Sequence, residues 1–422
     1  MNSKPLALIF STVWPEPQSS AAGVRQLQWV SWLKASGYQV ILSSPSKLKA
    51  DSDYGVELLP LPLNQSWVKD ELKRRNPDLI LFDRFILEEQ FGHFVYAACP
   101  NALVLLETED LHFVRRARDS VRENYLSLPS LPETFYDTDT ALRETASLMR
   151  VDHGIVVSSF EAELLRTRFK IREDQLSWIP FGYTEAVVES SFARPFLERE
   201  GFVWIGNFRH APNIDGLRWF RQQIWPLIRK LIPKVQIKVY GAYPSEEVMS
   251  WHKLETGFQV LGPARDLDQA FQTARVNLAP LRFGAGVKGK LLEGFRYGLP
   301  CVTTKVGVEG LMPKDWGPDR FPGREANHEI DFAEACADLY QNEIHWTRSR
   351  EQARKLMQTV YASAPGMQAS QLLEKLTAQK ASGELPNWQS KVLRHELLNS
   401  HKYFSKWIEA KEALLKRYPV TL

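Results

Sequence analysis

A glycine-rich turn with basic residues on both sides lies within the stretch 276–311, between two short apolar runs. Glycines let the backbone approach an anion closely, and the free N–H groups and dipole of a helix N-terminus face that anion. The helix predicted to follow begins with lysines, which oppose the dipole unless an anion is bound. The candidate anion-binding residues are Arg282, Gly284, Gly286, Lys288 and Lys290. A basic turn that is simply solvated is the alternative that charge alone allows.

A second group of ionisable residues follows the apolar run 102–106, which has the length of a buried strand. These residues, ETEDLHFVRR, extend from Glu107 to Arg116. In open α/β sheets, ligands bind beyond the carboxyl ends of the strands, so the group is placed for chemistry. No second histidine lies nearby at metal-ligand spacing, and we therefore predict no zinc site.

The run RFGAGVKGK at 282–290 resembles the donor-binding segment of the family-four-type (group 1) glycosyltransferases, which are retaining nucleotide-sugar enzymes with the GT-B fold. The resemblance implies that Arg282, Lys288 and Lys290 hold the donor diphosphate. It also implies that Glu293 binds the ribose hydroxyls. The family commonly places a second glutamate, facing the sugar, at the position where this chain has Ala285. Which residue contacts the donor sugar therefore stays open.

Two further segments resemble the acceptor side of the same enzymes. The loop after residue 106 resembles a polar loop that lines the reaction site, which makes Asp110 and His112 candidates for positioning the acceptor, with Arg115 beside them. The small-residue turn ending at Gly23, with Arg25 in the helix that follows, resembles the glycine-rich loop that faces the same site. An ordinary strand–helix turn and an ordinary surface histidine are the alternatives.

Two other donor contacts are implied by the resemblance. The turn GNFRHAPN at 206–213 matches the first turn of the donor domain, where Arg209 is the candidate contact. Glu309 follows the short β-prone run 301–304, in another strand-end loop. A solvated arginine is the alternative for Arg209. We take Asp110, His112 and Lys288 as the candidate catalytic residues.

The elements that must position these residues follow from the alternation of short apolar runs with helical segments, which predicts an α/β fold. The resemblance implies two Rossmann-like doubly wound domains that face each other across a cleft. We place the acceptor domain at 1–183, the donor domain at 184–385 and a C-terminal helical tail at 386–422, with a linker at 184–199. In related enzymes such a helix returns to the first domain.

The sequence Asp137-Thr138-Asp139 superficially matches the D-x-D metal motif of a different glycosyltransferase fold. That motif follows a strand, whereas this one immediately precedes a helical pattern at 141–150. Asp and Thr are favoured helix N-caps, so we predict a cap here.

The composition is that of a soluble globular protein. The chain has 422 residues, of which 44% are hydrophobic and 24% charged, and the net charge of +3 gives no electrostatic case for nucleic acid. Three widely spaced cysteines suit a reducing cytoplasm, and we expect no signal peptide and no membrane span. The basic amphipathic tail could touch anionic lipid at the inner face of the membrane, although a tail packed on the core is the commoner case.

These features predict a glycosyltransferase of hexosyl type, active in glycan or glycoconjugate biosynthesis. We expect a nucleotide-diphosphate sugar as co-substrate, no other cofactor and no metal, with retention of configuration. The acceptor is a glycan, a lipid-linked sugar or another hydroxyl compound. A nucleotide-sugar epimerase of the same architecture and a non-catalytic nucleotide-sugar-binding protein are the alternatives.

Overall fold

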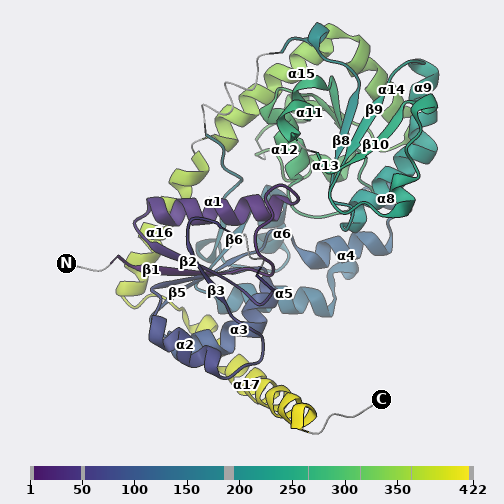
Figure 1. Ribbon diagram of the computed structural model, residues 1–422. Coiled ribbons are helices and arrows are strands. Elements are labelled where there is room, and N and C mark those ends of the chain that lie inside the picture. The colour runs from purple at the N-terminus through teal and green to yellow at the C-terminus, as the bar shows by residue number, and fades with distance from the viewer. Residues whose placement is uncertain are drawn as a thin grey trace.

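The computed structural model describes residues 4–48, 53–184, 194–264, 266–313, 315–362 and 364–417. Two parallel β-sheets with helices around them form two units (Figure 1), so the predicted α/β architecture is confirmed. The first sheet has the order β3-β2-β1-β4-β5-β6-β7, with strands β1 (Leu6–Phe10), β2 (Gln39–Ser44), β3 (Glu57–Pro60), β4 (Leu79–Asp83), β5 (Leu103–Glu107), β6 (His153–Val156) and β7 (Leu176–Trp178). The second has the order β10-β9-β8-β11-β12-β13, with β8 (Phe202–Ile205), β9 (Ile237–Tyr240), β10 (Phe258–Gly262), β11 (Val276–Ala279), β12 (Cys301–Thr303) and β13 (Gly323–Glu325).

The helices connect and cover these strands. Those that follow the first-sheet strands are α1 (Ala21–Ala35), α2 (Trp67–Arg75), α3 (Phe85–Ala98), α4 (His112–Ser120), α5 (Asp139–Arg150) and α6 (Ser159–Thr167). The second sheet is accompanied by α8 (Ala211–Trp219), α9 (Trp225–Leu231), α10 (Glu246–Met249), α11 (Leu267–Thr273), α12 (Gly289–Arg296), α13 (Lys305–Val308), α14 (Glu329–Gln341) and α15 (Glu343–Leu356). The chain ends with α16 (Ala364–Ala381) and α17 (Trp388–Arg417). Single π-helical turns at Phe220–Ile224 and Met357–Tyr361 and short 3-10 turns at Tyr125–Ser127, Glu133–Tyr136, Glu173–Gln175, Phe196–Glu198, Leu254–Thr256 and Pro318–Arg320 join some of them.

The first sheet is covered on both faces. Strands such as β4 and β5, with the sequences LILFD and LVLLE, are buried throughout, as expected of a parallel sheet between two helix layers. One face packs with Trp29 and Leu33 of α1 and with Leu373 of α16. The other face packs with residues of α2 and α3, including Leu72 and Phe91.

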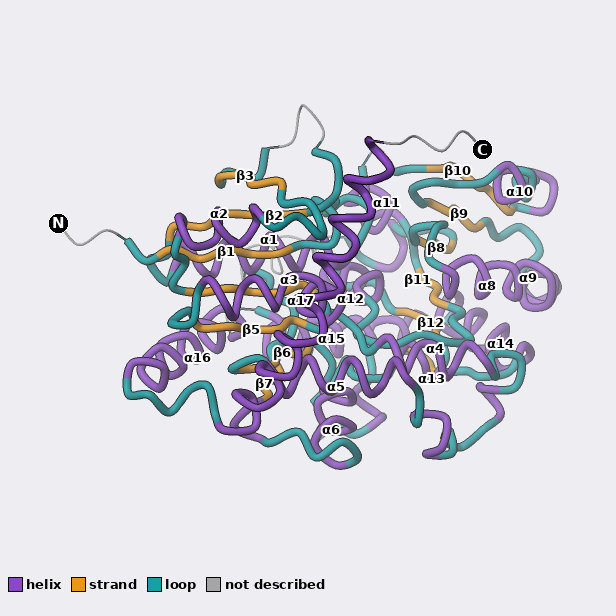
Figure 2. Tube along the Cα trace, turned by 90° about the horizontal axis from the view of Figure 1, so that it is seen from below, coloured by secondary structure: helices purple, strands orange, loops and turns teal. Residues whose placement is uncertain are grey.

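In each sheet, the strand order reverses at a position where a ligand site is expected. In the first sheet β1 lies between β2 and β4, and in the second β8 lies between β9 and β11. Crevices at the carboxyl ends of such strands are the usual ligand sites of open α/β sheets. Loops after these strands meet between the units, since Asn207 Nδ2 donates to Ser19 O at 3.5 Å and Tyr243 donates to Glu16 at 2.9 Å. Figure 2 shows the two sheets side by side.

The two last helices lie against the first unit. On α17, Ser390 Oγ donates to Met149 O at 2.7 Å, and Arg394 reaches Asp152 at 2.8 Å. Helix α16 falls within the range 184–385 that we assigned to the donor domain, but it packs on α1. Apolar residues of α16 on the first sheet explain this placement. Residues 185–193, part of the predicted linker, lie outside the described residues.

The predicted N-cap at 137–139 is confirmed. Helix α5 begins at Asp139, and the hydroxyl of Thr138 accepts from the backbone N–H of Ala141 at 3.2 Å. This hydrogen bond satisfies one of the free N–H groups of the first turn.

Candidate active site

The glycine loop before α12 requires its glycines. Gly284 and Gly286 have φ of +150° and +66°, which side chains rarely adopt. A Cβ added to Gly286 would lie 2.8 Å from Asp110 Cβ and 3.0 Å from Glu109 O. The donor loop of the second unit therefore touches the loop after β5 of the first, and the structure brings the two predicted motifs together.

Helix α4 begins in the loop after β5. Its N-cap residue is Leu111, whose side chain makes no capping hydrogen bond. The carboxyl group of Glu144 on α5 takes over this role. It accepts from the backbone N–H groups of His112 at 2.9 Å and Phe113 at 2.8 Å. Burial outweighs these hydrogen bonds and raises the pKa of Glu144 to about 8.

The candidate acceptor residues form one cluster. His112 Nε2 lies 3.6 Å from Asp110 Oδ1, and Arg115 donates to the other oxygen of Asp110. Burial lowers the pKa of His112 to about 4 despite the Asp110 charge, so the imidazole is neutral near pH 7. Burial alone would raise the pKa of Asp110, but the charge of Arg115, and that of His112 once acid protonates it, outweigh burial and lower that pKa. Asp110 is thus an ionised acceptor beside a neutral imidazole.

A buried glutamate joins the two loops. Glu161, near the start of α6, is fully buried, and its Oε1 accepts from Gly286 N at 2.7 Å and from Leu111 N at 3.1 Å. Burial, followed by the Asp110 charge, raises the pKa of Glu161 to about 7. This carboxyl group occupies a backbone N–H of the glycine loop and fixes the distance between the two motifs.

The two lysines that we predicted as diphosphate contacts lie at the start of α12. Lys288 Nζ donates to Ala285 O at 3.0 Å and to Gly286 O at 2.5 Å, and Lys290 Nζ donates to Asn213 Oδ1 at 2.7 Å. Burial lowers the pKa of Lys288 to about 8. Burial and then the Lys288 charge lower that of Lys290 to about 7. Both amino groups hold only neutral oxygen partners in these contacts, so the second unit presents cations that an anion would stabilise.

Arg282 and Glu309, which we also predicted to contact the sugar donor, form ion pairs across the two units instead. Arg282 Nε donates to Asp215 at 2.8 Å, and its Nη1 donates to Glu123 of the first unit at 2.7 Å. Glu309 accepts two hydrogen bonds of 2.7 Å from Arg118, which also donates to the carbonyl of Gly284 at 2.8 Å. The structure therefore places Arg282 and Glu309 in ion pairs that join the units.

The remaining donor candidates lie near the hinge and the second-unit loops. Glu293 accepts from the hydroxyl of Tyr183 at 2.9 Å, in the segment that follows β7. Arg209 stacks on Tyr243, with its guanidinium carbon 3.7 Å from the ring centre. Ala285, which stands in place of the family's second glutamate, packs against the apolar core.

Gly23 and Arg25, the two candidate residues at the turn between β1 and α1, both make structural contacts. A Cβ on Gly23 would lie 2.6 Å from the backbone of Glu16, so only glycine fits there. Arg25 is fully buried, with hydrogen bonds to Glu107 at 2.9 and 3.0 Å and to the carbonyl of Pro180 at 2.9 Å. Its guanidinium joins the start of α1 to the hinge.

Sequence reasoning missed the residues that assemble the site. Arg118, Glu144 and Glu161 are each buried and each bind an element distant in sequence. The arginine run 115–118 was visible, but nothing local showed that Arg118 would turn to Glu309. Among the described residues, no group of three or more His, Cys, Asp or Glu side chains is placed to hold a metal ion.

The second unit is similar to a known protein family. Residues 199–342 match the family model described as Glycosyl transferases group 1. The match covers about a third of the chain and lies within the second unit. The matched segment contains the glycine loop, α12 and Arg209, which are the parts of the predicted donor site in the second unit.

Solved structures with the same fold extend over nearly the whole chain. A glycosyltransferase from Rickettsia africae has a TM-score of 0.64 at 13% identity, over 90% of this chain and 100% of that one. Alr3699/HepE of Anabaena, solved in complex with UDP-glucose, has a TM-score of 0.61 at 11% identity, over 87% and 99%. These similarities confirm the predicted GT-B fold.

One curated relative is an uncharacterized 44.6 kDa protein in the cps region of Klebsiella pneumoniae, 24% identical over 161 residues. The match covers 36% of this chain and 41% of that protein. The chain thus matches about two fifths of that relative's length.

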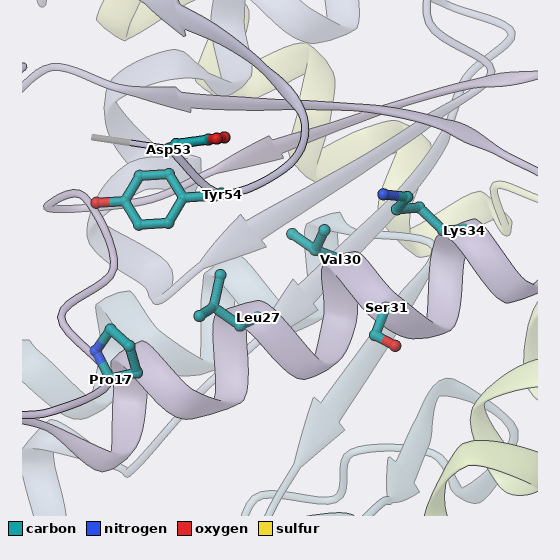
Figure 3. Close-up of a pocket in the computed structure, with 7 residues that line it drawn as sticks. All are labelled: Pro17, Leu27, Val30, Ser31, Lys34, Asp53 and Tyr54. Carbon is teal, nitrogen blue, oxygen red and sulfur yellow. The ribbon is translucent and has the colours of Figure 1, made fainter. Parts of the chain in front are cut away.

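A separate pocket of about 460 Å³ lies between α1 and the segment that precedes β3 (Figure 3), and none of the candidate site residues lines it. Its walls are formed by Pro17, Leu27, Val30, Ser31, Lys34, Asp53 and Tyr54. Within the described residues, no helix is long and apolar enough to cross a membrane.

Proposed function

We propose that this protein is a glycosyltransferase that moves a sugar from a nucleotide-diphosphate sugar to an acceptor hydroxyl, with retention of configuration and without a metal. The main support is the contact between the two motifs. The glycine loop that leads to Lys288 and Lys290 on the second unit touches the loop of Asp110 on the first. The match of residues 199–342 to the group 1 family model and the UDP-glucose complex of HepE support a nucleotide sugar as the donor.

Bond cleavage at the anomeric carbon develops negative charge on the departing diphosphate. Lys288 is only 9% exposed, and a cation in such a poorly solvated site interacts more strongly with that charge than it would in water. Asp110 would accept a hydrogen bond from the acceptor hydroxyl, with His112 beside it as a neutral partner. Front-face attack, in which the departing phosphate takes the acceptor proton, requires no protein nucleophile.

Arg282, Glu293, Glu309 and Arg209 stay predictions as donor contacts. Arg282 and Glu309 would first have to exchange partners, since each is in an ion pair between the units. A donor that broke the ion pairs of Arg282 and Glu309 would therefore also weaken the contact between the units.

The test measures nucleotide release and the sugar product. UDP-, GDP-, dTDP- and ADP-sugars would be incubated with the enzyme and a panel of glycosides, with and without a chelator. We expect one donor to be consumed with formation of a glycoside of unchanged anomeric configuration. A free epimer formed without an acceptor would indicate an epimerase. Binding with neither transfer nor slow hydrolysis would indicate a non-catalytic protein.

We also propose a cytoplasmic location with a peripheral contact to anionic lipid through α17. Its outward face presents Tyr403, Trp407 and Leu414, which are 67%, 57% and 57% exposed, and Lys411 lies over the ring of Trp407. Glu409 faces inward and accepts from Ser66. Co-sedimentation with anionic vesicles should fall when Tyr403 and Trp407 become alanine. It should not change for Ile344→Ala, an exposed residue on α15. Equal sedimentation of all three proteins would contradict the contact.

A further inference from the structure

Glu109, two residues after the end of β5 at Glu107, has an unusual backbone conformation. Glu109 has φ of +61°, in the left-handed region that non-glycine residues rarely adopt. Arg84, directly after the neighbouring strand β4, has φ of +74°. Strain of this kind persists only where the surroundings impose it, and it clusters at functional sites. Both residues lie at the carboxyl end of the first sheet.

The carboxylates around Glu109 each have a cationic partner. Asp83 Oδ2 accepts from Arg84 at 3.0 Å and also from Thr12 and Gln26. Glu107 Oε2 pairs with Arg25, and Asp110 pairs with Arg115. The charges of these three acidic residues are thus balanced by three arginines.

Glu109 differs from them. It is 8% exposed, yet its Oε1 is buried and has no hydrogen-bond partner among the described residues. No ion pair to Glu109 is formed within the part of the chain that the structure describes. Oδ1 of Asp83 and Oε1 of Glu107 are likewise buried without a hydrogen bond to any described group. A buried acceptor without a partner destabilises the folded protein. This site therefore lacks hydrogen-bond donors.

Glu109 also lies beside the donor loop, since its carbonyl oxygen is 3.0 Å from the Cβ position of Gly286. We propose that the Glu109 carboxyl group binds a hydroxyl of the acceptor, and that the group bound there is a neutral polyol rather than a phosphate or carboxylate. This inference rests on the proposed transferase function. An uncharged hydroxyl supplies the missing donor, whereas the oxygens of a carboxylate or an ionised phosphate only accept hydrogen bonds and would leave these buried acceptors without a partner.

The electrostatics agree with this assignment. Burial and then the charge of Asp83 raise the pKa of Glu109 well above its usual value, against the opposing effect of Arg84. Glu107 raises it further and Arg25 lowers it. A ligand hydroxyl that donates to the carboxylate would stabilise the charged form and lower this pKa again.

The first test separates a binding role from a structural one. Glycine adopts a positive φ without strain, so Glu109→Gly removes both the strain and the unpaired carboxyl group. We expect a higher melting temperature for Glu109→Gly and also for Glu109→Gln. A structural carboxyl group would give a lower melting temperature in both variants, which would overturn the proposal. Lys170→Gly is the matched control, because Lys170 has φ of +55° at an exposed position outside the site.

The second test measures the ligand. Saturation-transfer NMR would be recorded with methyl β-glucoside and with glucose 6-phosphate, each in the presence of UDP. We expect a clear glucoside signal with wild type and Lys170→Gly, at least fivefold less with Glu109→Gly, and a weaker signal from the phosphate. An unchanged signal in Glu109→Gly, or no glucoside signal with wild type, would overturn the assignment. UDP binding, followed by thermal shift in the same samples, tests the proposed function separately.

Discussion

The lysines at the start of α12 make donor binding dependent on pH. Burial, with the Lys288 charge, lowers the pKa of Lys290 to about 7, so this residue is protonated in about nine tenths of molecules at pH 6 and about one tenth at pH 8. Lys288, with a pKa of about 8, loses about half its charge over the same range. A diphosphate requires both in the charged form. Apparent affinity should therefore fall about 20-fold from pH 6 to pH 8, which is about 1.8 kcal/mol.

Calorimetric titration with a nucleotide sugar measures this effect directly, because its diphosphate is esterified at both ends and does not titrate in this range. Proton uptake on binding should appear as a dependence of the enthalpy on the buffer. The control is Lys290→Arg, whose guanidinium stays charged. Glu161 titrates near pH 7 in both proteins, so the difference between them reports Lys290 and should be about tenfold. Equal pH dependence in the two proteins would refute this role of Lys290.

Three further predictions concern the contact between the units. Gly286→Ala should lose about 1–2 kcal/mol of stability from its positive φ alone and more from the contact with Asp110, and a urea melt that matches wild type would contradict this. Glu309→Gln leaves the buried guanidinium of Arg118 without its ion pair and should cost about 3 kcal/mol, whereas a loss below 1 kcal/mol would show that the pair is dispensable. Glu161 has a folded pKa of about 7 against a reference value of 4.5, so its stabilising effect is complete below pH 4.5 and is lost, by about 3 kcal/mol, as the pH rises through 7. The fall in melting temperature from pH 5 to pH 8 should accordingly be smaller in Glu161→Gln.

The strands were largely predictable because the first sheet is buried on both faces. Runs such as 6–10 and 79–83 are almost continuously apolar, and polar interruptions mark their ends. The cap at Thr138 was predictable for a local reason, since its hydrogen bond reaches only to Ala141. The placement of α16 on the first unit was not predictable from the sequence, because an apolar helix face does not specify the sheet on which it packs.

The loops of the site were predictable from their glycines and charges, but the partners of the side chains were not. Arg118 and Glu309 are 191 residues apart, and no sequence pattern links them. The same holds for Glu161, whose position on a helix shows nothing of the two loops that it joins. The guanidinium groups of Arg282 and Arg25 were reasonable candidates for ligand contacts. In the structure, Arg282 donates to the carboxylate of Asp215 and Arg25 donates to the carbonyl of Pro180.

The proposed function requires that Lys288 and Lys290, at the start of α12, bind the diphosphate of a nucleotide sugar. The most direct measurement is the thermal shift produced by UDP-, GDP-, dTDP- and ADP-sugars, in the presence of a chelator, on wild type and on the Lys288→Ala/Lys290→Ala variant. We expect one donor to stabilise wild type, by about 2.7 kcal/mol at a hundred times its Kd, and to leave the variant unchanged. Stabilisation of the variant to the same extent would place the donor elsewhere and contradict the claim.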